Sequence, residues 1–371
     1  MAALDRLRLA WLGWRNRLIA DPGFQRLASS LPLVRWIAAR RARALFDLCA
    51  GFVYSQVLLA CVRLDLFGRL AAGPLAVDAL ARELDLSPDA ADRLLRAATS
   101  LKLVRRLKDG RVALDDLGAA LLGNPAIAAF VEHHALLYDD LRDPVALLRG
   151  EARTRLAGFW PYDEASSGRA AQAAATYSEL MSATQPLVAR DILDAYDFGR
   201  HRNVLDVGGG EGRFLEAVAA ACPALRLTLF DLPPVIERAR TRLAASAVAK
   251  RISLVAGSFL DDALPSGADL VTLVRVVHDH DDATVRLLLR RVFEALPRGG
   301  ALLIAEPMAA AAGAEPVGDA YFGFYLMAMG SGRARRPDEL VNLLAGAGFG
   351  RIRRLKTRRP LITGALVATK V

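Results

Sequence analysis

The stretch Asn203-Val204-Leu205-Asp206-Val207-Gly208-Gly209-Gly210-Glu211-Gly212-Arg213-Phe214 decides the fold. The apolar run over 204–207 predicts a buried strand, the glycines predict a sharp turn, and residues 214–218 predict the helix that follows. Glycine suits such a turn because the backbone must bend sharply and let a ligand lie against bare amides. The start of the following helix offers unpaired N–H groups and a positive dipole end, which favour an anionic group.

Two classes of ligand use such a turn, and the glycine spacing separates them. Dinucleotide sites need Gly-x-Gly-x-x-Gly, but Arg213 occupies the place of the last glycine. The observed order, with Asp206 leading Gly208, Gly210 and Gly212, is similar to class I methyltransferases that bind S-adenosylmethionine (SAM). Asp231 ends the next apolar run, where a carboxylate can accept hydrogen bonds from both ribose hydroxyls. The alternative is a purely structural strand-to-helix turn.

The composition favours a helix-rich protein of a reducing compartment. The chain has 371 residues, of which 53% are hydrophobic, and three cysteines (Cys49, Cys61 and Cys222) that no motif pairs. We therefore expect neither a disulfide framework nor a metal site, and a cytoplasmic location. The sequence has no uncharged apolar run of about 18 residues, so we expect no spanning helix. Charged residues close to the first methionine argue against a signal peptide.

Residues 1–46 carry most of the net charge of +9, with nine arginines against Asp5 and Asp21. Leucines and tryptophans alternate with these arginines at helical spacing. This pattern suits a helix lying on an anionic membrane, which would be the inner or the photosynthetic membrane. It equally suits a solvated helix that packs its apolar stripe on the next domain.

Residues 74–122 predict a winged helix: helices over 77–84 and 89–101, then two short strands around Lys108-Asp109-Gly110. One interpretation is a DNA-binding regulator, with phosphate contacts from Arg93, Arg96, Arg105, Arg106, Lys108 and Arg111. The second helix, however, lacks the Asn, Gln and Arg set that reads base edges. We favour a module for packing and dimerisation, with no nucleic-acid partner.

The segments on either side of this unit are predicted to be helical. Residues 44–70 are apolar on all faces, so this helix must be buried within the protein or by a second subunit. Residues 123–200 contain His133 and His134, for which the sequence offers no further metal ligands. Aromatic or cofactor-facing candidates in the same region are Trp160, Tyr162, Tyr177, Met181 and Ser182, for each of which core packing is the alternative.

From residue 201 onward, strands and helices alternate. Strands are predicted over 203–207, 225–230, 252–256, 269–274 and 301–305, with helices near 213–221, 234–247, 282–296 and 337–347. Residues 351–356 and 361–370 predict a terminal antiparallel hairpin. Such alternation predicts an α/β fold, Rossmann-like, with a mostly parallel sheet and helices on both faces. Ligands of such sheets bind at the carboxyl ends of the strands.

Polar residues follow each predicted strand at that edge. Ser258 and Phe259 could contact an adenine edge and face, and Arg275 follows the fourth strand. A hydroxyl acceptor of a methyl group must lose a proton, and neutral histidine is a suitable recipient. We predict His278 as the base and Glu306 as the carboxylate that orients it. His280 is the competing candidate, although it is expected to open the following helix.

These residues resemble the two-domain O-methyltransferases of plants and bacteria. The motifs that carry the likeness are Asp206–Gly212, Phe230-Asp231-Leu232-Pro233 and His278-Asp279. The resemblance implies a helical and winged-helix dimerisation domain over 44–190 and a SAM-dependent catalytic domain over 191–371, which the basic arm over 1–43 precedes. It also implies a homodimer, SAM held by Gly208 and Asp231, adenine contacts from Ser258 and Phe259, and His278 as base. We expect Asp206, Gly210 and Arg275 to belong to the same cofactor site.

Two positions depart from the family pattern. Ser258 stands where an acidic residue is common, and Ala334 stands where some members have a second glutamate beside the base. A closer likeness, over residues 44–56, 133–138 and 318–330, is to the hydroxycarotenoid O-methyltransferases of purple phototrophic bacteria. That likeness implies a lipophilic substrate methylated at the tertiary 1-hydroxyl of an acyclic carotenoid. A phenolic acceptor, a tetrapyrrole carbon and a SAM-sensing regulator stay open as alternatives.

Overall fold

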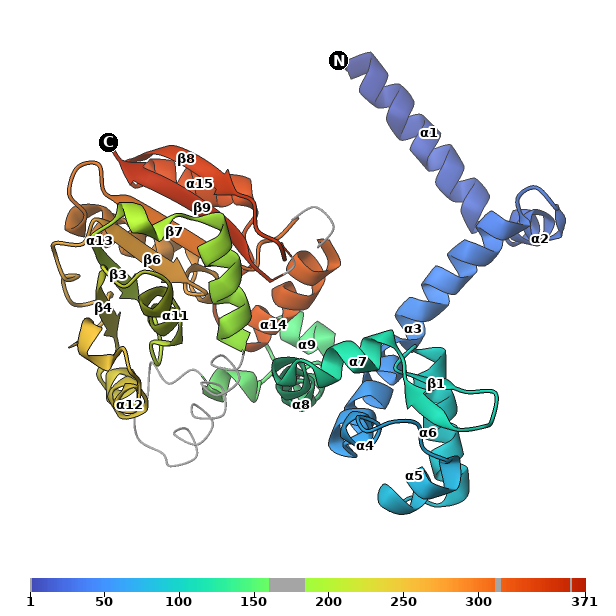
Figure 1. The fold of residues 1–371 in the computed structure, drawn as a ribbon. Coiled ribbons are helices and arrows are strands. Elements are labelled where there is room, and N and C mark those ends of the chain that lie inside the picture. The colour runs from blue at the N-terminus through green and yellow to red at the C-terminus, as the bar shows by residue number, and fades with distance from the viewer. Residues whose placement is uncertain (1, 160–183, 311–314, 361) are drawn as a thin grey trace. The chain divides into compact units, whose positions relative to one another are not determined.

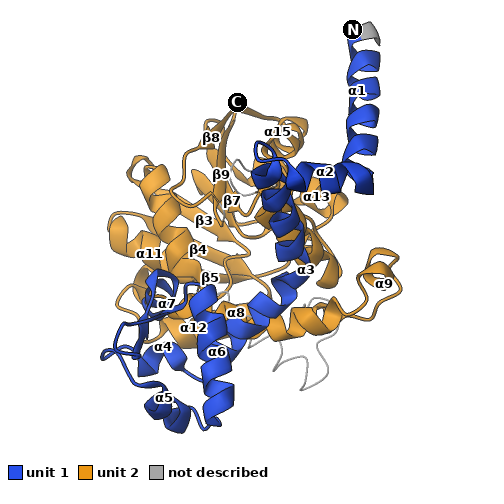
Figure 2. Cartoon of the chain, turned by 90° about the vertical axis from the view of Figure 1, so that its right-hand side faces the viewer, with its two compact units in different colours: residues 1–123 blue, residues 124–371 orange. Residues whose placement is uncertain are grey.

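A computed structural model describes residues 2–159, 184–310, 315–360 and 362–371. The chain divides into two compact units, residues 1–123 and 124–371 (Figure 2). The predicted domain limits at residues 43 and 190 differ from this division and stay predictions. Trp160, Tyr162, Tyr177, Met181 and Ser182, which the sequence singled out, lie outside the described residues.

The first unit begins with three helices, α1 (Ala2–Ala20), α2 (Pro22–Ser30) and α3 (Arg35–Arg63) (Figure 1). Asp21 caps α2 by accepting a hydrogen bond from the Phe24 amide at 2.6 Å. Most of α3 is not covered by its own chain, since Phe46 is 65% and Leu48 81% exposed. By length and composition α3 could cross a membrane, with a mean hydropathy of 1.8 and 11% of the apolar window buried. The sequence predicted no such helix because only runs without any charged residue were considered. Core helices of soluble proteins can have the same length and composition.

The rest of the first unit has the predicted helices and hairpin. Its elements are α4 (Leu66–Arg69), α5 (Val77–Glu83), α6 (Pro88–Ser100), β1 (Val104–Arg106), β2 (Val112–Leu114) and α7 (Asp116–Leu122). The Ser87 hydroxyl caps α6 by accepting from the Ala90 amide. Five of the six basic side chains considered for DNA phosphates instead form ion pairs with nearby aspartates. These pairs are Arg93–Asp89, Arg96–Asp92, Arg106–Asp92, Arg105–Asp115 and Arg111–Asp109.

The second unit is built on a seven-stranded sheet of order β5-β4-β3-β6-β7-β9-β8 (Figure 1). The strands are β3 (Asn203–Val207), β4 (Arg226–Asp231), β5 (Ile252–Ala256), β6 (Leu270–Val274), β7 (Ala301–Glu306), β8 (Phe349–Leu355) and β9 (Gly364–Lys370). Strands β3 to β7 are parallel, while β9 is antiparallel to both of its neighbours. The predicted mostly parallel sheet with a terminal hairpin is therefore confirmed.

Helices cover both faces of this sheet because successive strand residues point in opposite directions. Val204 packs in the cluster that contains Phe214 and Ile236, and Leu205 packs in the cluster that contains Leu288 and Leu340. The covering helices are α11 (Arg213–Ala221), α12 (Pro233–Leu243), α13 (Asp282–Ala295), α15 (Pro337–Gly346) and a helix over 184–195. The strands read as continuous apolar runs since both faces are buried.

A third cluster of the second unit joins segments that are far apart in sequence. It contains Leu137, Leu147, Leu156, Tyr325, Leu326 and Met329. The elements involved are α8 (Pro125–Asp140), α9 (Pro144–Leu148), the 3-10 turn Leu156–Phe159, the π-helix η5 (Pro316–Phe322) and α14 (Gly323–Ala328). Further 3-10 turns are Phe198–Arg200, Ala249–Arg251 and η4 (Val277–Asp279).

Candidate active site

The glycine turn after β3 leaves open space beside Gly210. Gly208, Gly210 and Gly212 have φ values of 69°, 60° and 78°, which favour glycine. A Cβ atom on Gly208 would lie 2.9 Å from Val276, so this glycine also allows close packing against the loop after β6. A Cβ atom on Gly210 would meet no atom within 4 Å. The backbone of Gly210 is therefore accessible to a ligand at this edge of the sheet. Helix α11 begins directly after the turn.

Asp206 lies beneath this turn. Its Oδ1 accepts a hydrogen bond from the Thr272 hydroxyl on β6 at 2.6 Å, and its side chain is fully buried. Burial raises the pKa of Asp206 to about 7, with a further contribution from Asp231. The Oδ2 atom is buried without a hydrogen-bond partner among the described residues. The sequence did not point to Thr272, which holds this carboxylate in place.

Asp231, the last residue of β4, contacts the glycine turn from the neighbouring strand. Its Oδ2 accepts from the Gly210 amide at 2.8 Å and its Oδ1 from the Leu232 amide at 2.7 Å. Burial raises the pKa of this carboxyl to about 6, while the two amides lower it. Asp231 is therefore mostly ionised at neutral pH, beside the open space at Gly210, as a ribose-binding carboxylate needs to be.

The loop after β5 places the two residues predicted to contact adenine. The Ser258 hydroxyl accepts from the Leu260 amide at 3.1 Å, and the Ser258 amide donates to Asp262 at 2.8 Å. The ring of Phe259 packs edge-on against the ring of His280, with centroids 5.2 Å apart. Sequence reasoning missed Asp262, which brings a carboxylate to the loop where the family often has an acidic residue at the position of Ser258.

Arg275 lies just beyond β6 in the left-handed backbone conformation, with φ 60°. Its amide donates to the Ala305 carbonyl at 2.8 Å, which keeps the loop on β7. Its Nη1 donates to the Thr184 hydroxyl at 2.8 Å, at the start of the helix over 184–195. These contacts hold that helix at the carboxyl edge of the sheet, and a role in binding the cofactor stays a prediction.

His278 sits in the turn η4 between two carboxylates. Its Nε2 lies 3.1 Å from Asp279 Oδ1, and its Nδ1 lies 3.4 Å from Glu306 Oε2. The same Glu306 oxygen accepts the His278 backbone amide at 3.0 Å. Burial lowers the pKa of the imidazole, but Asp279 and Glu306 outweigh it and raise the pKa to about 9. The contact between Asp279 and Nε2 was not anticipated from the sequence.

The competing histidine has a different environment. His280 follows η4 and precedes Asp281, which caps α13 by accepting the Thr284 amide at 2.8 Å. Burial lowers the pKa of His280. Its ring packs on Phe259, so it lies close to the adenine candidates, and the charges of Asp279 and Asp281 do not outweigh the effect of its burial. The geometry favours His278 as the base.

An aromatic cluster lies next to His278. The ring of Phe322 in η5 is 6.5 Å from the imidazole, and Tyr321 stacks on Tyr325 at 5.8 Å. The two histidines of α8 bind these tyrosines: His133 Nε2 lies 2.8 Å from the Tyr325 hydroxyl, and His134 Nε2 lies 2.9 Å from that of Tyr321. The histidine pair thus belongs to an aromatic hydrogen-bond network, and no metal-binding group of three acidic, Cys or His side chains occurs in the described parts of the chain.

Comparison with known families agrees with this geometry. Residues 46–124 match the O-methyltransferase dimerisation domain, and residues 138–350 match the O-methyltransferase domain. The chain belongs to this O-methyltransferase family. The second match covers more than half of the chain and contains the glycine turn, Asp231, His278 and Glu306.

Relatives cover nearly the whole length of this O-methyltransferase. The demethylspheroidene O-methyltransferase of Cereibacter sphaeroides is 45% identical over 95% of this chain and 94% of its own length. The enzyme of the same name from Rhodobacter capsulatus is 42% identical over 96% and 89%. The crystal structure of human N-acetylserotonin methyltransferase in complex with SAM superposes with a TM-score of 0.71 at 26% identity, covering 89% of this chain and 97% of that one.

The site of this O-methyltransferase fits SAM by three observations. Gly210 faces open space, and Asp231 ends the adjacent strand with an ionised carboxylate. Under the turn, Asp206 Oδ2 is buried without a hydrogen-bond partner among the described residues. When bound, SAM supplies an electrophilic methyl group on a sulfonium. Methyl transfer of this kind depends on positioning and on excluding water. The residues that would hold SAM at the sheet edge are those of the glycine turn and Asp231.

Proposed function

We propose that this enzyme transfers the methyl group of SAM to the tertiary 1-hydroxyl of an acyclic hydroxycarotenoid. The observation that carries the proposal is the 45% identity to a demethylspheroidene O-methyltransferase across almost the full length of both chains. The surroundings of His278 agree with a lipophilic acceptor. Phe322, Tyr321 and Tyr325 lie on that side, and buried Leu326 and Met329 follow them.

His278 acts as the base in this proposal, and the acidity of the acceptor limits when it acts. A tertiary alcohol is far less acidic than imidazolium, so His278 does not remove the proton beforehand. It takes the proton as the methyl group arrives, when the oxygen becomes acidic. Because Asp279 lies beside Nε2, the acceptor hydroxyl competes with Asp279 for this nitrogen. Glu306, whose Oε2 lies 3.4 Å from Nδ1, stabilises by its charge the imidazolium that forms.

This arrangement predicts a rate that increases toward alkaline pH. The base is the neutral imidazole, and a pKa of about 9 leaves His278 mostly protonated at neutral pH. We expect kcat/KM to rise about tenfold per pH unit from 6.5 up to about 9 and then to level off. In Asp279→Asn, which loses the main charge that raises this pKa, the half-maximal rate should move to lower pH. Glu294→Gln, on the exposed face of α13, is the charge-matched control; a common profile for all three proteins would contradict the assignment.

The acceptor is tested by transfer of label from methyl-labelled SAM to a panel of alcohols. We expect acyclic carotenoids with a tertiary 1-hydroxyl to be methylated at least about 100 times faster, by kcat/KM, than phenols, and tetrapyrrole precursors not at all. A preference for phenols would instead align the enzyme with relatives such as N-acetylserotonin methyltransferase, and would overturn the carotenoid proposal.

We also propose that the enzyme is a homodimer assembled through α3. The first unit matches a dimerisation domain, and α3 exposes a set of large apolar side chains beside several arginines and Asp47. The apolar side chains include Leu45, Phe46, Leu48, Phe52 and Val53. An apolar face of this extent is stable in water when a second copy covers it.

The dimer proposal predicts that Phe46→Glu combined with Leu48→Glu produces a monomer. A carboxylate buried in an apolar interface costs several kcal/mol, enough to weaken dimerisation by at least about 100-fold. Sedimentation equilibrium measures the change. Leu148→Glu, at a position 57% exposed in the second unit, is the matched control and should stay dimeric. A double variant that remains a dimer would exclude this face.

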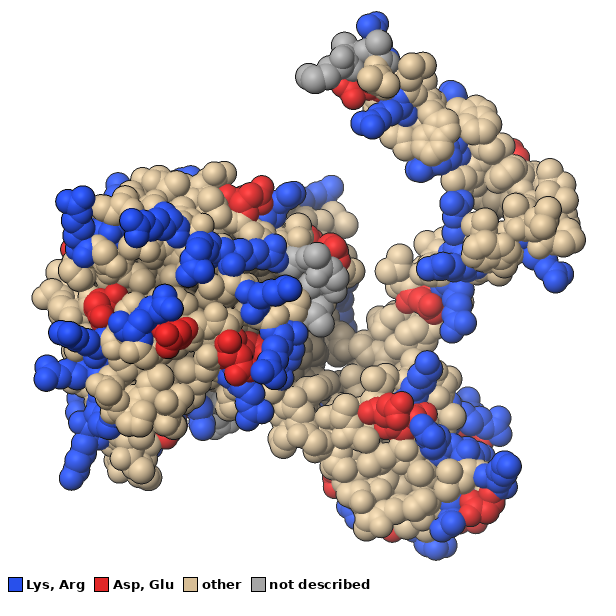
Figure 3. All heavy atoms as spheres, turned by 45° about the horizontal axis from the view of Figure 1, so that its top comes forward, with Lys and Arg blue, Asp and Glu red and all other residues tan. Residues whose placement is uncertain are grey.

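For the basic arm we propose a peripheral contact with an anionic membrane. In α1 the apolar side chains Leu4, Leu7, Trp11, Trp14 and Leu18 repeat every three or four residues and form one stripe. Trp11 and Trp14 are 55% and 56% exposed. Basic side chains occur along α1 to α3 among residues without charge (Figure 3). Further exposed leucines lie outside this stripe, so the proposal depends on tryptophans and arginines occurring together along the helix, as they do in helices that lie in a membrane interface.

Removal of residues 2–43 should weaken binding to liposomes containing an anionic lipid by at least about tenfold, since each basic residue near such a surface contributes about 1 kcal/mol. Binding is measured by co-sedimentation, with neutral liposomes as the comparison. Equal binding of both proteins would contradict the membrane role, and loss of dimerisation on deletion would assign the arm to the subunit interface instead.

A further inference from the structure

The turn that carries His278 is bound along its length by one segment, residues 331–335, which we call the clamp segment. The carbonyl oxygens of four successive residues of the turn each accept a hydrogen bond from it. The pairs are Val277 with Arg335 Nη1 at 2.8 Å, His278 with the Arg333 amide at 2.9 Å, Asp279 with the Ser331 hydroxyl at 2.8 Å, and His280 with Arg335 Nη2 at 2.7 Å.

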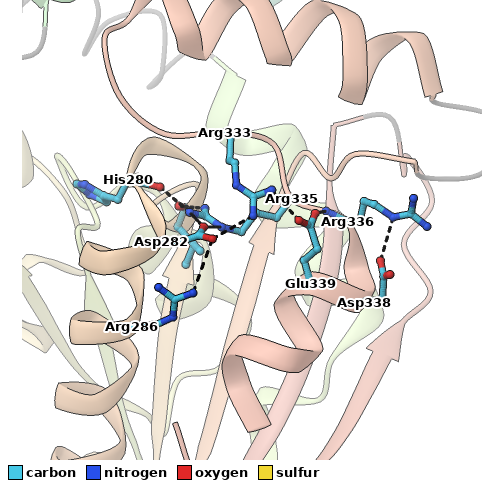
Figure 4. A network of polar contacts seen from close by, with 9 residues as sticks. His280, Asp282, Arg286, Arg333, Arg335, Arg336, Asp338 and Glu339 are labelled. Atoms are coloured by element: carbon cyan, nitrogen blue, oxygen red, sulfur yellow. Dashed lines mark hydrogen bonds and ion pairs between the residues drawn. The ribbon is translucent and has the colours of Figure 1, made fainter. Parts of the chain in front are cut away.

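Arg335 makes two of these four contacts. It is fully buried, and its planar guanidinium bonds the carbonyls at both ends of the turn, Val277 and His280. Its Nε and Nη2 also donate to Asp282 Oδ1 at 2.9 and 2.7 Å, at the start of α13. Figure 4 shows Asp282 with Arg286, Arg333 and Arg335 around it. Asp282 therefore compensates the buried charge and ties the turn to α13.

The backbone of the clamp segment is shaped to lie against the turn. Gly332 has φ +81°, and a Cβ atom there would come within 2.2 Å of the His278 carbonyl oxygen and 2.5 Å of the Asp279 carbonyl carbon. Glycine is thus required for the close approach. Ala334, between Arg333 and Arg335, packs with the cluster around Tyr325 instead of offering a carboxylate to His278.

We propose that Arg335 is a positioning residue, whose guanidinium fixes the turn Val277–Asp279 so that the His278 imidazole is held between Asp279 and Glu306. The inference rests on the proposed role of His278 as base. Arg335 makes no contact with the imidazole itself and acts through the backbone. The planar fork matters because a single ammonium cannot bond two carbonyls and a carboxylate in fixed directions.

The test compares Arg335→Lys with Arg286→Lys. Both residues pair with Asp282, but Arg286 lies 3.9 Å from it, is 60% exposed and contributes nothing to the turn, so it is the matched control. The chain has five histidines, so NMR of the ¹⁵N-histidine-labelled enzyme resolves the His278 ring, assigned by its loss in His278→Ala. This titration needs neither SAM nor an acceptor. Its outcome is thus separate from that of the proposed function.

In Arg335→Lys we expect the pKa of His278 to fall from about 9 toward its ordinary value of 6.5, as the ring loses its fixed distances to Asp279 and Glu306. With an accepted alcohol, kcat should fall about 100-fold, the cost of a misplacement of about 1 Å, while the KM for SAM changes less than about threefold. Arg286→Lys should match the wild type in both. If Arg335→Lys does not fold, Asp282→Ala, which removes the oxygen that accepts from Nε and Nη2 of Arg335, should lower the pKa of His278 in the same direction. A folded Arg335→Lys, or failing that a folded Asp282→Ala, with unaltered His278 titration would overturn the proposal.

Discussion

Replacing His278 by alanine lowers kcat for methyl transfer about 10³-fold, while the affinity for SAM changes less than about threefold. A reduction of kcat by this factor is typical for the loss of a general base. SAM affinity is retained because the predicted SAM contacts come from the glycine turn, Asp231 and the loop after β5. Stopped-flow or quenched assays at saturating SAM measure kcat, and isothermal titration calorimetry measures the affinity.

His280→Ala is the control for this prediction, because His280 is the competing candidate two residues away. His280→Ala removes the edge-on contact with Phe259 and keeps the His278 imidazole beside Asp279 and Glu306. We expect a reduction below about tenfold. A larger loss in His280→Ala than in His278→Ala would reverse the assignment of the base.

The second large effect is expected at Asp231. Asp231→Asn should weaken SAM binding about 50-fold, since an ionised acceptor of two hydroxyls contributes roughly 1.5 to 3 kcal/mol. The amide oxygen of asparagine can still accept the Gly210 N–H, which supports the glycine turn, while the Leu232 N–H loses its acceptor. Calorimetric titration with SAM measures the loss, and thermal unfolding without ligand reports whether the fold is retained.

Glu237→Gln on α12 provides the comparison for Asp231→Asn. Glu237 lies on the helix that follows Asp231, is 70% exposed and pairs with Arg240 at 3.5 Å. It should bind SAM as the wild type does. An unchanged affinity in Asp231→Asn would remove the ribose-binding role and leave this carboxylate as a support of the glycine turn.

The sheet of the second unit was predictable because its signals are local. Each central strand is a short apolar run, bounded by a glycine, proline or acidic residue in all but β6, which Arg275 follows, and β3, β5 and the start of β7 fall at the predicted residues. The prediction of a helix over 44–70 was less accurate. It begins earlier, at Arg35, and ends at Arg63, because Asp65 adopts the left-handed conformation and starts a separate short helix.

The candidate site was predictable where residues directly follow strands, and not where a contact spans the fold. Glu306 ends β7 and His278 lies in the turn that follows the neighbouring strand β6, so their proximity follows from the order of the sheet. The contact of Asp279 with Nε2 depends on the 3-10 turn, which no periodicity reveals. Arg335 lies 58 residues from its partner Val277, and an arginine in a polar stretch gives no sign that it will be buried.

The most direct test of the whole account is a crystal structure of the enzyme with S-adenosylhomocysteine and a hydroxycarotenoid. We predict the sulfur over the carboxyl edge of the sheet, the ribose on Asp231, and the acceptor hydroxyl within hydrogen-bond distance of His278 Nε2 and in line with the sulfur. A nucleoside bound elsewhere, or an imidazole at position 278 turned away from the acceptor, would contradict it.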